Sequence, residues 1–334
     1  MSGAVGTAGG ARSPWLGADR WRRLFRDVPI IPLSGLLLLL VALLEAVSPG
    51  DIVNPNWVAV TIRAAIPLAI LAACQTLTML TGGIDLSVGM VASAAAYIMA
   101  TQSEPLGAGP AILLGVAAAG LAGLVNGVGI GVFRVHPLIM TLGMSLVILG
   151  LLTVYQLTAV TAGVRVPTEI GWLGSDLTLG FVPNNLFVFL PIAALILFAL
   201  RRSGFGRLLY AIGDNPIAAR LSGVRAWQIL IALYIVSALL AAVAGILFAG
   251  LSKTASLSLV ERSVLPSVAA AVIGGTSIMG GRGGYAGTIV GALILTVLAT
   301  LLSVLQMPEG VRLILFGAIV VSVAAAYTRV TGET

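Results

Sequence analysis

The sequence contains few charged residues: Asp, Glu, Lys and Arg together account for 9% of its 334 positions, whereas soluble globular domains carry about 25%. Hydrophobic residues make up 59% of the chain. A folded chain of this composition would expose more apolar surface than water tolerates, so it requires lipid around it. The composition therefore excludes a soluble enzyme, a nucleic-acid-binding protein and a disordered scaffold.

Cysteine, histidine and lysine are almost absent, with one residue of each: Cys74, His136 and Lys253. One cysteine excludes a disulfide within the chain and any multi-cysteine metal or iron–sulfur site, and one histidine excludes a histidine-based metal cluster. Cys74 lies in an apolar run and is predicted to be a small buried hydrophobic residue. Because no Gly-Lys-Ser/Thr occurs, the chain lacks a Walker A motif and does not itself hydrolyse nucleotide. We expect neither a cofactor, a metal nor a catalytic site.

Long stretches without charge predict the fold. A helix needs about 20 apolar residues to cross about 30 Å of hydrocarbon, and inside lipid the backbone must satisfy its own hydrogen bonds. The apolar content is continuous rather than alternating, so the sequence predicts an all-α polytopic membrane protein with about ten transmembrane helices. The ten charge-free stretches are 28–44, 64–84, 86–103, 105–133, 135–164, 177–200, 226–252, 263–281, 283–308 and 313–328.

The distribution of basic residues predicts the orientation. If the ten spans alternate, 13 of the 18 basic residues fall on the side of the N-terminus and four on the other side. An excess of Arg and Lys marks the cytoplasmic side, so both termini are expected inside. We expect a basic cytoplasmic tail at 1–29, a membrane domain at 30–328 and a short cytoplasmic tail at 329–334. Arg63, the one basic residue within a span, is expected to reach the outer interface in a structural role.

Two connections between spans are too long to be simple turns. The outer connection, 160–183, is expected to contain a short interfacial helix. The inner connection, 201–226, is predicted to form two short helical turns that are broken at 213–216. Asp214 or Asn215 could cap a helix with Pro216 at its first position. A short amphipathic cytoplasmic helix flanked by glycines is typical of a docking element for another protein.

Glycines interrupt three of the apolar regions, at 81–89, 123–127 and 274–284. Either they allow tight turns and close helix packing, or they mark broken helices that line a polar path. Asp85 in the first segment could cap the following helix or pair structurally, or it could line a pathway; we favour capping. The candidate pathway residues are Gln75, Asp85, Ser87, Asn126, Thr141 and Ser145.

Four segments give the sequence a resemblance to a known family. They are TGGIDLSVGMVAS (81–93), GLVNGVGIGVFRVHPLIMTLG (123–143), GRLLYAIGDNPIAARLSGV (206–224) and AAAVIGGTSIMGGRGGYAGTIVGALI (269–294). Together they resemble the membrane permeases of ribose/xylose/galactose-type bacterial ABC importers, over residues 60 to 327. The chain departs from that pattern at His136 and Leu138. It also lacks the acidic residue expected shortly before the segment SVAAAVIGG that follows Pro266, and Glu261, five residues before Pro266, could take that role at a shifted position.

The resemblance implies a type II ABC importer-like permease in a bacterial inner membrane. The topology derived from the charges also places spans two to five inverted relative to spans seven to ten, which is an inverted repeat. The resemblance implies three partners: a cytoplasmic tandem ATP-binding subunit, a second permease copy or paralogue, and a periplasmic sugar-binding protein. The solute would be a sugar or a sugar-like compound. The segment that would couple to the ATPase contains Gly206, Arg207, Tyr210, Gly213, Asn215, Pro216, Ala219, Arg220 and Gly223.

Two other functions fit the sequence less well. An ion-coupled secondary transporter of a small polar solute needs ionisable residues within the bundle, and Asp85 is the one plausible candidate well inside. An intramembrane enzyme needs a catalytic constellation, and none emerges. The sequence therefore favours an importer permease that is driven by a separate ATPase. Replacing Gly213 with a bulky β-branched residue is expected to uncouple ATP hydrolysis from transport while the fold stays in the membrane.

Overall fold

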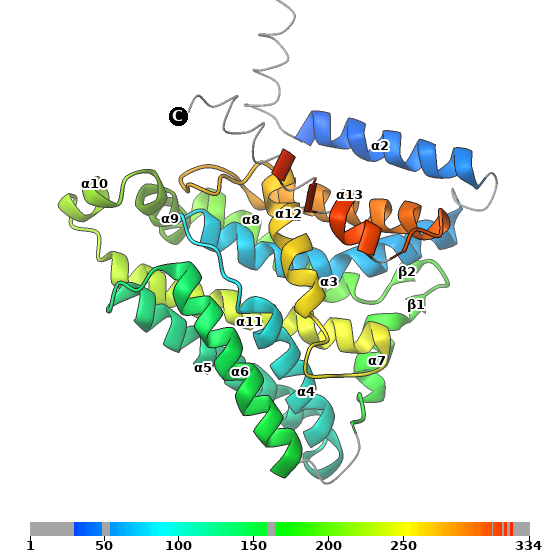
Figure 1. The fold of residues 1–334 in the computed structure, drawn as a ribbon, viewed down its shortest axis with the longest axis horizontal. Helices are drawn as coiled ribbons and strands as arrows, with labels where there is room; N and C mark the ends of the chain where they lie inside the picture. The colour runs from blue at the N-terminus through cyan, green and yellow to red at the C-terminus, as the bar shows by residue number, and fades with distance from the viewer. Residues whose placement is uncertain are drawn as a thin grey trace, which may run out of the picture.

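The computed structural model describes residues 30–48, 54–158, 164–308, 310–315, 317–318 and 321–322. Apart from one short hairpin, this part of the chain is built from helices (Figure 1). In chain order the elements are α2 (Ile30–Val47), α3 (Pro55–Met79), α4 (Val88–Leu106), α5 (Ala108–Gly131), α6 (Pro137–Thr158), α7 (Thr168–Ser175), β1 (Leu177–Thr178), β2 (Val182–Pro183), α8 (Leu186–Arg202), α9 (Gly204–Asp214), α10 (Pro216–Leu221), α11 (Ala226–Ser252), the single turn η1 (Glu261–Ser263), α12 (Val264–Ile273) and α13 (Tyr285–Val304).

Six helices of the described chain, namely α2, α3, α5, α6, α11 and α13, are long and apolar enough to cross a membrane. The number rises to seven if α8 and α9, which meet at an angle of 65°, form one broken span. The prediction of an all-α polytopic membrane protein is confirmed at this level. The count of ten spans and the inverted repeat stay predictions.

The helix boundaries agree with the charge-free stretches in some places and not in others. The stretch 226–252 coincides with α11 (Ala226–Ser252). The stretch 263–281 does not form a continuous span, because α12 ends at Ile273 after ten residues. At 1.5 Å per residue α12 is about 15 Å long, half the hydrocarbon thickness of about 30 Å. The predictions for 1–29 and 329–334, and most of 313–328, lie outside the described residues.

Helix α11 lies at the centre of the bundle and packs against α3, α4 and α5. The contact with α5 runs along glycines at every fourth position. A Cβ atom at Gly123 would lie 2.5 Å from the Tyr234 carbonyl oxygen, and one at Gly127 would lie 2.6 Å from the Ile231 Cα atom. Small residues at this spacing let two membrane helices approach closely. Since α5 is continuous through 123–127, this segment is a packing surface, and the alternative of a broken helix is wrong there.

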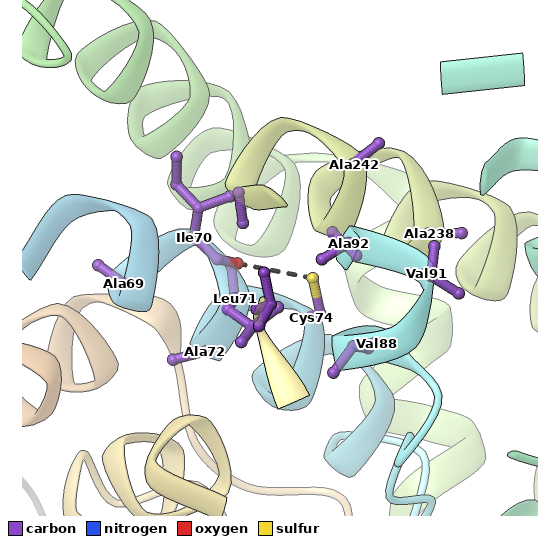
Figure 2. Close-up of a cluster of buried hydrophobic side chains, with 14 of the residues drawn as sticks. Ala69, Ile70, Leu71, Ala72, Cys74, Val88, Val91, Ala92, Ala238 and Ala242 are labelled. Carbon is purple, nitrogen blue, oxygen red and sulfur yellow. Dashed lines mark hydrogen bonds between the residues drawn. The ribbon is translucent and has the colours of Figure 1, made fainter. Parts of the chain in front are cut away.

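The core next to α11 is filled by small side chains of α3 and α4. Figure 2 shows Cys74 among alanines, valines and leucines from these three helices. The Cys74 thiol donates to the Ile70 carbonyl oxygen at 3.5 Å and to the Ser237 carbonyl oxygen at 3.2 Å. Cys74 is fully buried. The prediction of a buried structural cysteine is therefore confirmed.

The expected short helix in the connection 160–183 is α7, which lies beside α11 (Figure 1). It is followed by the β1–β2 hairpin, in which Leu177 pairs with Pro183. Arg63 of α3 donates from Nη1 to the Ser175 carbonyl oxygen at the end of α7. The Arg63 carbonyl oxygen accepts a hydrogen bond from Asn185 Nδ2 at 2.8 Å. Arg63 therefore has the structural role predicted for it.

Candidate functional site: a coupling segment and two backbone breaks

The coupling segment, as we name residues 201–226, forms the two short helices that its sequence predicts. Helix α9 begins after Ser203, whose Oγ accepts from Gly206 N at 3.1 Å, and α10 begins with Pro216. Asn215, rather than Asp214, caps α10: its Oδ1 accepts from Ile217 N at 3.1 Å and from Ala218 N at 2.9 Å. The break occurs here because the side chain of Asn215 replaces the missing helical acceptors and Pro216 cannot continue α9.

The coupling residues divide between an inner and an outer face. Gly206 and Ala219 are buried, and Tyr210 and Gly213 are half-buried. Gly223 has a φ of +84° at the turn after α10. The remaining four coupling residues, which are exposed, are Arg207, Asn215, Pro216 and Arg220. The segment thus presents a polar, basic outer surface and is fixed to the bundle by small residues.

Gly213 lies at a junction of three backbone segments. A Cβ atom there would lie 1.8 Å from the Leu80 carbonyl oxygen and 2.5 Å from Gly281 N. Those two residues are joined directly, because Gly281 N donates to the Leu80 carbonyl oxygen at 3.0 Å. Gly280 and Gly281 have φ values of +94° and +69°, a region that favours glycine. We call this contact of Leu80, Gly213 and Gly281 the glycine junction.

Tyr210 adds a side-chain link beside the glycine junction. Its hydroxyl group donates to the Gly283 carbonyl oxygen at 2.8 Å. Tyr210 lies in α9, outside the six spans, and its partial burial raises the pKa of the phenol, while Arg201 has the opposite, smaller effect. The hydroxyl group therefore stays protonated at neutral pH and remains a donor.

The other candidate residues meet around the break between α3 and α4. Asp85 is 3% exposed, and its Oδ1 accepts from Ser87 N at 2.9 Å and from Ser87 Oγ at 2.6 Å. Its Oδ2 accepts from Ser237 Oγ of α11 at 3.5 Å. Asn126 of α5 donates from Nδ2 to Ser87 Oγ at 2.9 Å. A chain of hydrogen bonds thus runs from α5 through the break to α11.

The backbone of the same break is held from both sides. Gln75 of α3 donates from Nε2 to the Asp85 carbonyl oxygen at 2.7 Å. From α6, Thr141 Oγ1 accepts from Leu86 N at 3.2 Å, and Ser145 Oγ donates to the Leu86 carbonyl oxygen at 3.0 Å. Such bonds fix an irregular backbone that lipid alone could not satisfy.

All six candidate pathway residues therefore belong to one network, which we call the Asp85 network. Five of them are buried and Ser145 is half-buried. Asp85 bonds to the backbone and side chain of the residue two positions on, which is the geometry of an Asx turn. The N-cap of α4 is Ser87, which has no side-chain capping bond, so Asp85 pairs structurally just before α4 and does not cap it. A role in the pathway stays a prediction.

Several residues of these two sites carry no signal in the sequence. Ser237 lies in the otherwise apolar run of α11, and the role of Leu80 depends only on its carbonyl group. The glycine-rich segment 274–284 is conspicuous in the sequence, but nothing in the sequence indicates that it contacts Leu80 and Gly213. Among the residues that the structure describes, no three His, Cys, Asp or Glu side chains are grouped so that they could hold a metal ion.

Comparisons with known proteins identify the family of the chain. The sequence model of a family described as "Branched-chain amino acid transport system / permease component" matches residues 58–324. The chain is 31% identical to a fructose import permease protein of Rhizobium meliloti over 274 residues, which are 80% of this chain and 76% of that protein. It is 35% identical to a ribose import permease protein of Escherichia coli K12 over 266 residues, 78% of this chain and 81% of that protein. A galactofuranose transporter permease protein of the same strain is 37% identical over 255 residues, 74% of this chain and 70% of that protein.

Proposed function

This chain belongs to the family of ABC import permease components, and from that premise we propose that it carries a sugar or sugar-like solute across the inner membrane of a bacterium. A separate ATP-binding subunit would supply the energy, and a periplasmic binding protein would deliver the solute. The relatives are named for fructose, ribose and galactofuranose import, which supports a sugar as the solute. The same names favour an ATP-driven importer over an ion-coupled secondary transporter.

The observation that carries this proposal is the geometry of the coupling segment. Its exposed surface holds Arg207 and Arg220, and its inner surface is fixed to the bundle by the glycine junction and by Tyr210. A rigid element that is exposed on one side and joined to two breaks on the other can transmit movement from a bound ATPase. We assign the ATPase contact to Gly206–Gly223 for this reason.

The charge distribution and the length of α12 bear on the remaining architecture. The bias of 13 basic residues against four supports cytoplasmic termini. Helix α12 is long enough to cross about half of the hydrocarbon layer and is followed by a glycine-rich loop. Such interrupted helices recur in transporters built from inverted repeats. We propose ten spans per subunit and a pair of permeases, either two copies of this chain or this chain with a paralogue.

We propose that the Asp85 network is the closed part of the solute pathway. Apart from Asp85, its side chains are uncharged and weakly polar, as suits an uncharged polyhydroxylated solute that should not be held tightly within the membrane. In the described structure these side chains bond to one another. Opening would replace those bonds by bonds to solute hydroxyl groups.

Cross-linking tests the ATPase contact directly. The single native cysteine, Cys74, is fully buried, so an introduced surface cysteine is the one that a bulky reagent reaches. Ile217→Cys, at a position in α10 that is 69% exposed, should cross-link to a co-expressed ATP-binding subunit. The matched control is Leu179→Cys on the β1–β2 hairpin, 79% exposed, which should not. Equal cross-linking of both variants, or of neither, would contradict the assignment.

Solute uptake completes the test. The assembled transporter in proteoliposomes should take up radiolabelled ribose, fructose or galactose only when ATP and the binding protein are both present. Uptake that depends on a proton or sodium gradient and not on ATP would instead support the secondary transporter.

A further inference from the structure

A cavity of about 300 Å³ lies between the coupling segment and the bundle. Its walls come from α5, α9, α10 and α11, from the first residue of α6 and from the two loops that follow α3 and α12. This volume is at the lower end of the range of about 300–1,000 Å³ that small-molecule pockets occupy. The lining includes Thr81, Ile130, Pro137, Arg220, Tyr234 and Met279.

The wall of this cavity contains a buried hydroxyl group without a partner. Tyr234 of α11 is 1% exposed, and its hydroxyl group makes no hydrogen bond within the described structure. A Cβ atom at Gly83 would lie 3.0 Å from this oxygen, so the hydroxyl group lies beside the break between α3 and α4. Because a buried hydroxyl group is normally bonded, Tyr234 offers a donor to a ligand.

The remaining polar groups of the cavity define the chemistry of that ligand. Arg220 of α10 is the one charged residue in the lining, and its guanidinium group bonds to no other residue that the structure describes. Thr81 already uses its hydroxyl hydrogen on the Thr78 carbonyl oxygen at 2.9 Å, so it can only accept from a ligand. The lining is therefore complementary to a ligand that carries a negative charge, several hydrogen-bond acceptors and at least one hydroxyl group.

We propose that this cavity binds a small phosphate ester of a polyol, with the phosphate group on Arg220 and the hydroxyl-bearing carbons towards Tyr234 and Thr81. The planar guanidinium group matches phosphate oxygens in pairs. The carbon face of the ligand would pack against Pro137 and Ile130. An uncharged sugar would leave Arg220 without a counter-charge, so it fits the lining less well.

The occupied cavity would change the coupling segment. A bound ester bridges α10, which carries Arg220, and α11, which carries Tyr234, across the side of α9 that holds Gly213. It would thereby restrain the segment that we assign to the ATPase. The inference rests on the proposed function only in taking a sugar as the polyol: a kinase reaction that phosphorylates the imported sugar would supply the ligand on the cytoplasmic side.

Binding is tested on the full-length permease in nanodiscs of uncharged lipid, by calorimetric titration with ribose 5-phosphate and, separately, with ribose. The ester should bind saturably and at least about tenfold more tightly than the free sugar. Arg220→Gln and Tyr234→Phe should each weaken binding of the ester by about tenfold, as expected for the loss of one bond to a charged group. Arg220 is exposed and the phenylalanine variant keeps the ring, so both variants should fold.

Two matched variants control for general effects. Arg207→Gln removes another arginine of the coupling segment that does not line the cavity, and Tyr97→Phe removes a buried hydroxyl group elsewhere. Both should bind the ester as the unmodified chain does. The proposal is overturned if the ester does not bind saturably, or if Arg207→Gln weakens binding as much as Arg220→Gln.

A lipid headgroup could supply the same chemistry, and a second arm distinguishes the two sources. The titration is repeated in nanodiscs that contain phosphatidylglycerol. If this lipid blocks the ester, and Arg220→Gln abolishes its retention in native mass spectra, the phosphate ester in the cavity is the lipid headgroup. Uptake by the assembled transporter is measured separately. Absence of saturable ester binding to the unmodified chain, with intact uptake, refutes the cavity proposal alone, and ester binding without ATP-dependent uptake refutes the proposed function alone.

Discussion

Replacing Gly213 with alanine tests the coupling proposal with the smallest possible change. The added Cβ atom would lie 1.8 Å from the Leu80 carbonyl oxygen, whereas non-bonded atoms favour about 3.5 Å. Helix α9 must therefore withdraw by about 1.7 Å, or the hydrogen bond from Gly281 N to Leu80 must open. Alanine alone already overlaps the backbone. The larger β-branched residue considered in the sequence analysis would displace α9 further and is not needed to test coupling.

The magnitude follows from three contributions. Overpacking at a close contact costs about 1–3 kcal/mol, and loss of one backbone hydrogen bond adds about 1 kcal/mol. Alanine in place of glycine within a helix returns up to about 1 kcal/mol. The contact at the glycine junction therefore weakens by about 1–3 kcal/mol. Since 1.4 kcal/mol is tenfold in an equilibrium constant, the lower end of this range corresponds to about fivefold, and we expect solute transported per ATP hydrolysed to fall by about fivefold or more.

The assay measures solute uptake and ATP hydrolysis together in proteoliposomes. Gly204→Ala is the matched control, because it lies in the same helix and a Cβ atom there would meet only Arg207 Nη2, at 3.9 Å. The control should keep normal coupling, while Gly213→Ala should hydrolyse ATP with little uptake. Cross-linking through Ile217→Cys verifies that the ATPase still binds. Normal uptake per ATP in Gly213→Ala, with the ATPase bound, would refute the reasoning.

Three further predictions concern Asp85, the orientation and the packing. Asp85→Asn keeps an oxygen that can accept the bonds from the following residues, so this variant should assemble and transport with a modest loss. Asp85→Leu instead leaves buried donors unpaired, at about 1–3 kcal/mol each. A fully assembled but inactive asparagine variant would show that the carboxylate itself serves transport. In oriented membranes, Ile217→Cys should react only with a cytoplasmic reagent and Leu179→Cys only with an external one, and the opposite result would reverse the topology. Gly123→Ala, whose Cβ atom would lie 2.5 Å from a carbonyl oxygen, should lower the melting temperature of the detergent-solubilised protein, while Gly143→Ala, with no atom within 4 Å, should not; equal melting temperatures would contradict the packing of α5 on α11.

The sequence predicted the extent of some helices because charged side chains are excluded from the hydrocarbon. This works for α11, where charged residues flank the helix directly. It fails for 263–281, because lack of charge reports depth in the membrane and not helical conformation. There the helix stops at Ile273, and Gly275 takes a φ of +89° that ends the regular backbone.

The sequence identified the candidate polar residues, but it did not indicate which of them contact one another. Asn126 bonds to a serine 39 positions away, and Ser145 bonds to a carbonyl group 59 positions away. Such pairs depend on the rotation of each helix, which is set by small-residue contacts such as that of Gly127 with Ile231. A single sequence shows that glycine is present but not which backbone approaches it.

The glycine junction and the Asp85 network are only a few residues apart along one loop, and this spacing gives coupling a physical route. Leu80 accepts its bond from Gly281, and Asp85, five positions later, is held by serine and glutamine groups. The junction has backbone contacts with no side chain to absorb a displacement, so movement of α9 must shift the loop. The network resists with hydrogen bonds of about 0.5–1.5 kcal/mol each between neutral groups, and of about 1.5–3 kcal/mol each where the Asp85 carboxylate accepts. A displacement that costs a few kcal/mol can therefore open the weaker of these bonds. In the proposed pathway, solute hydroxyl groups would replace them at nearly equal energy, as quick release of the solute requires.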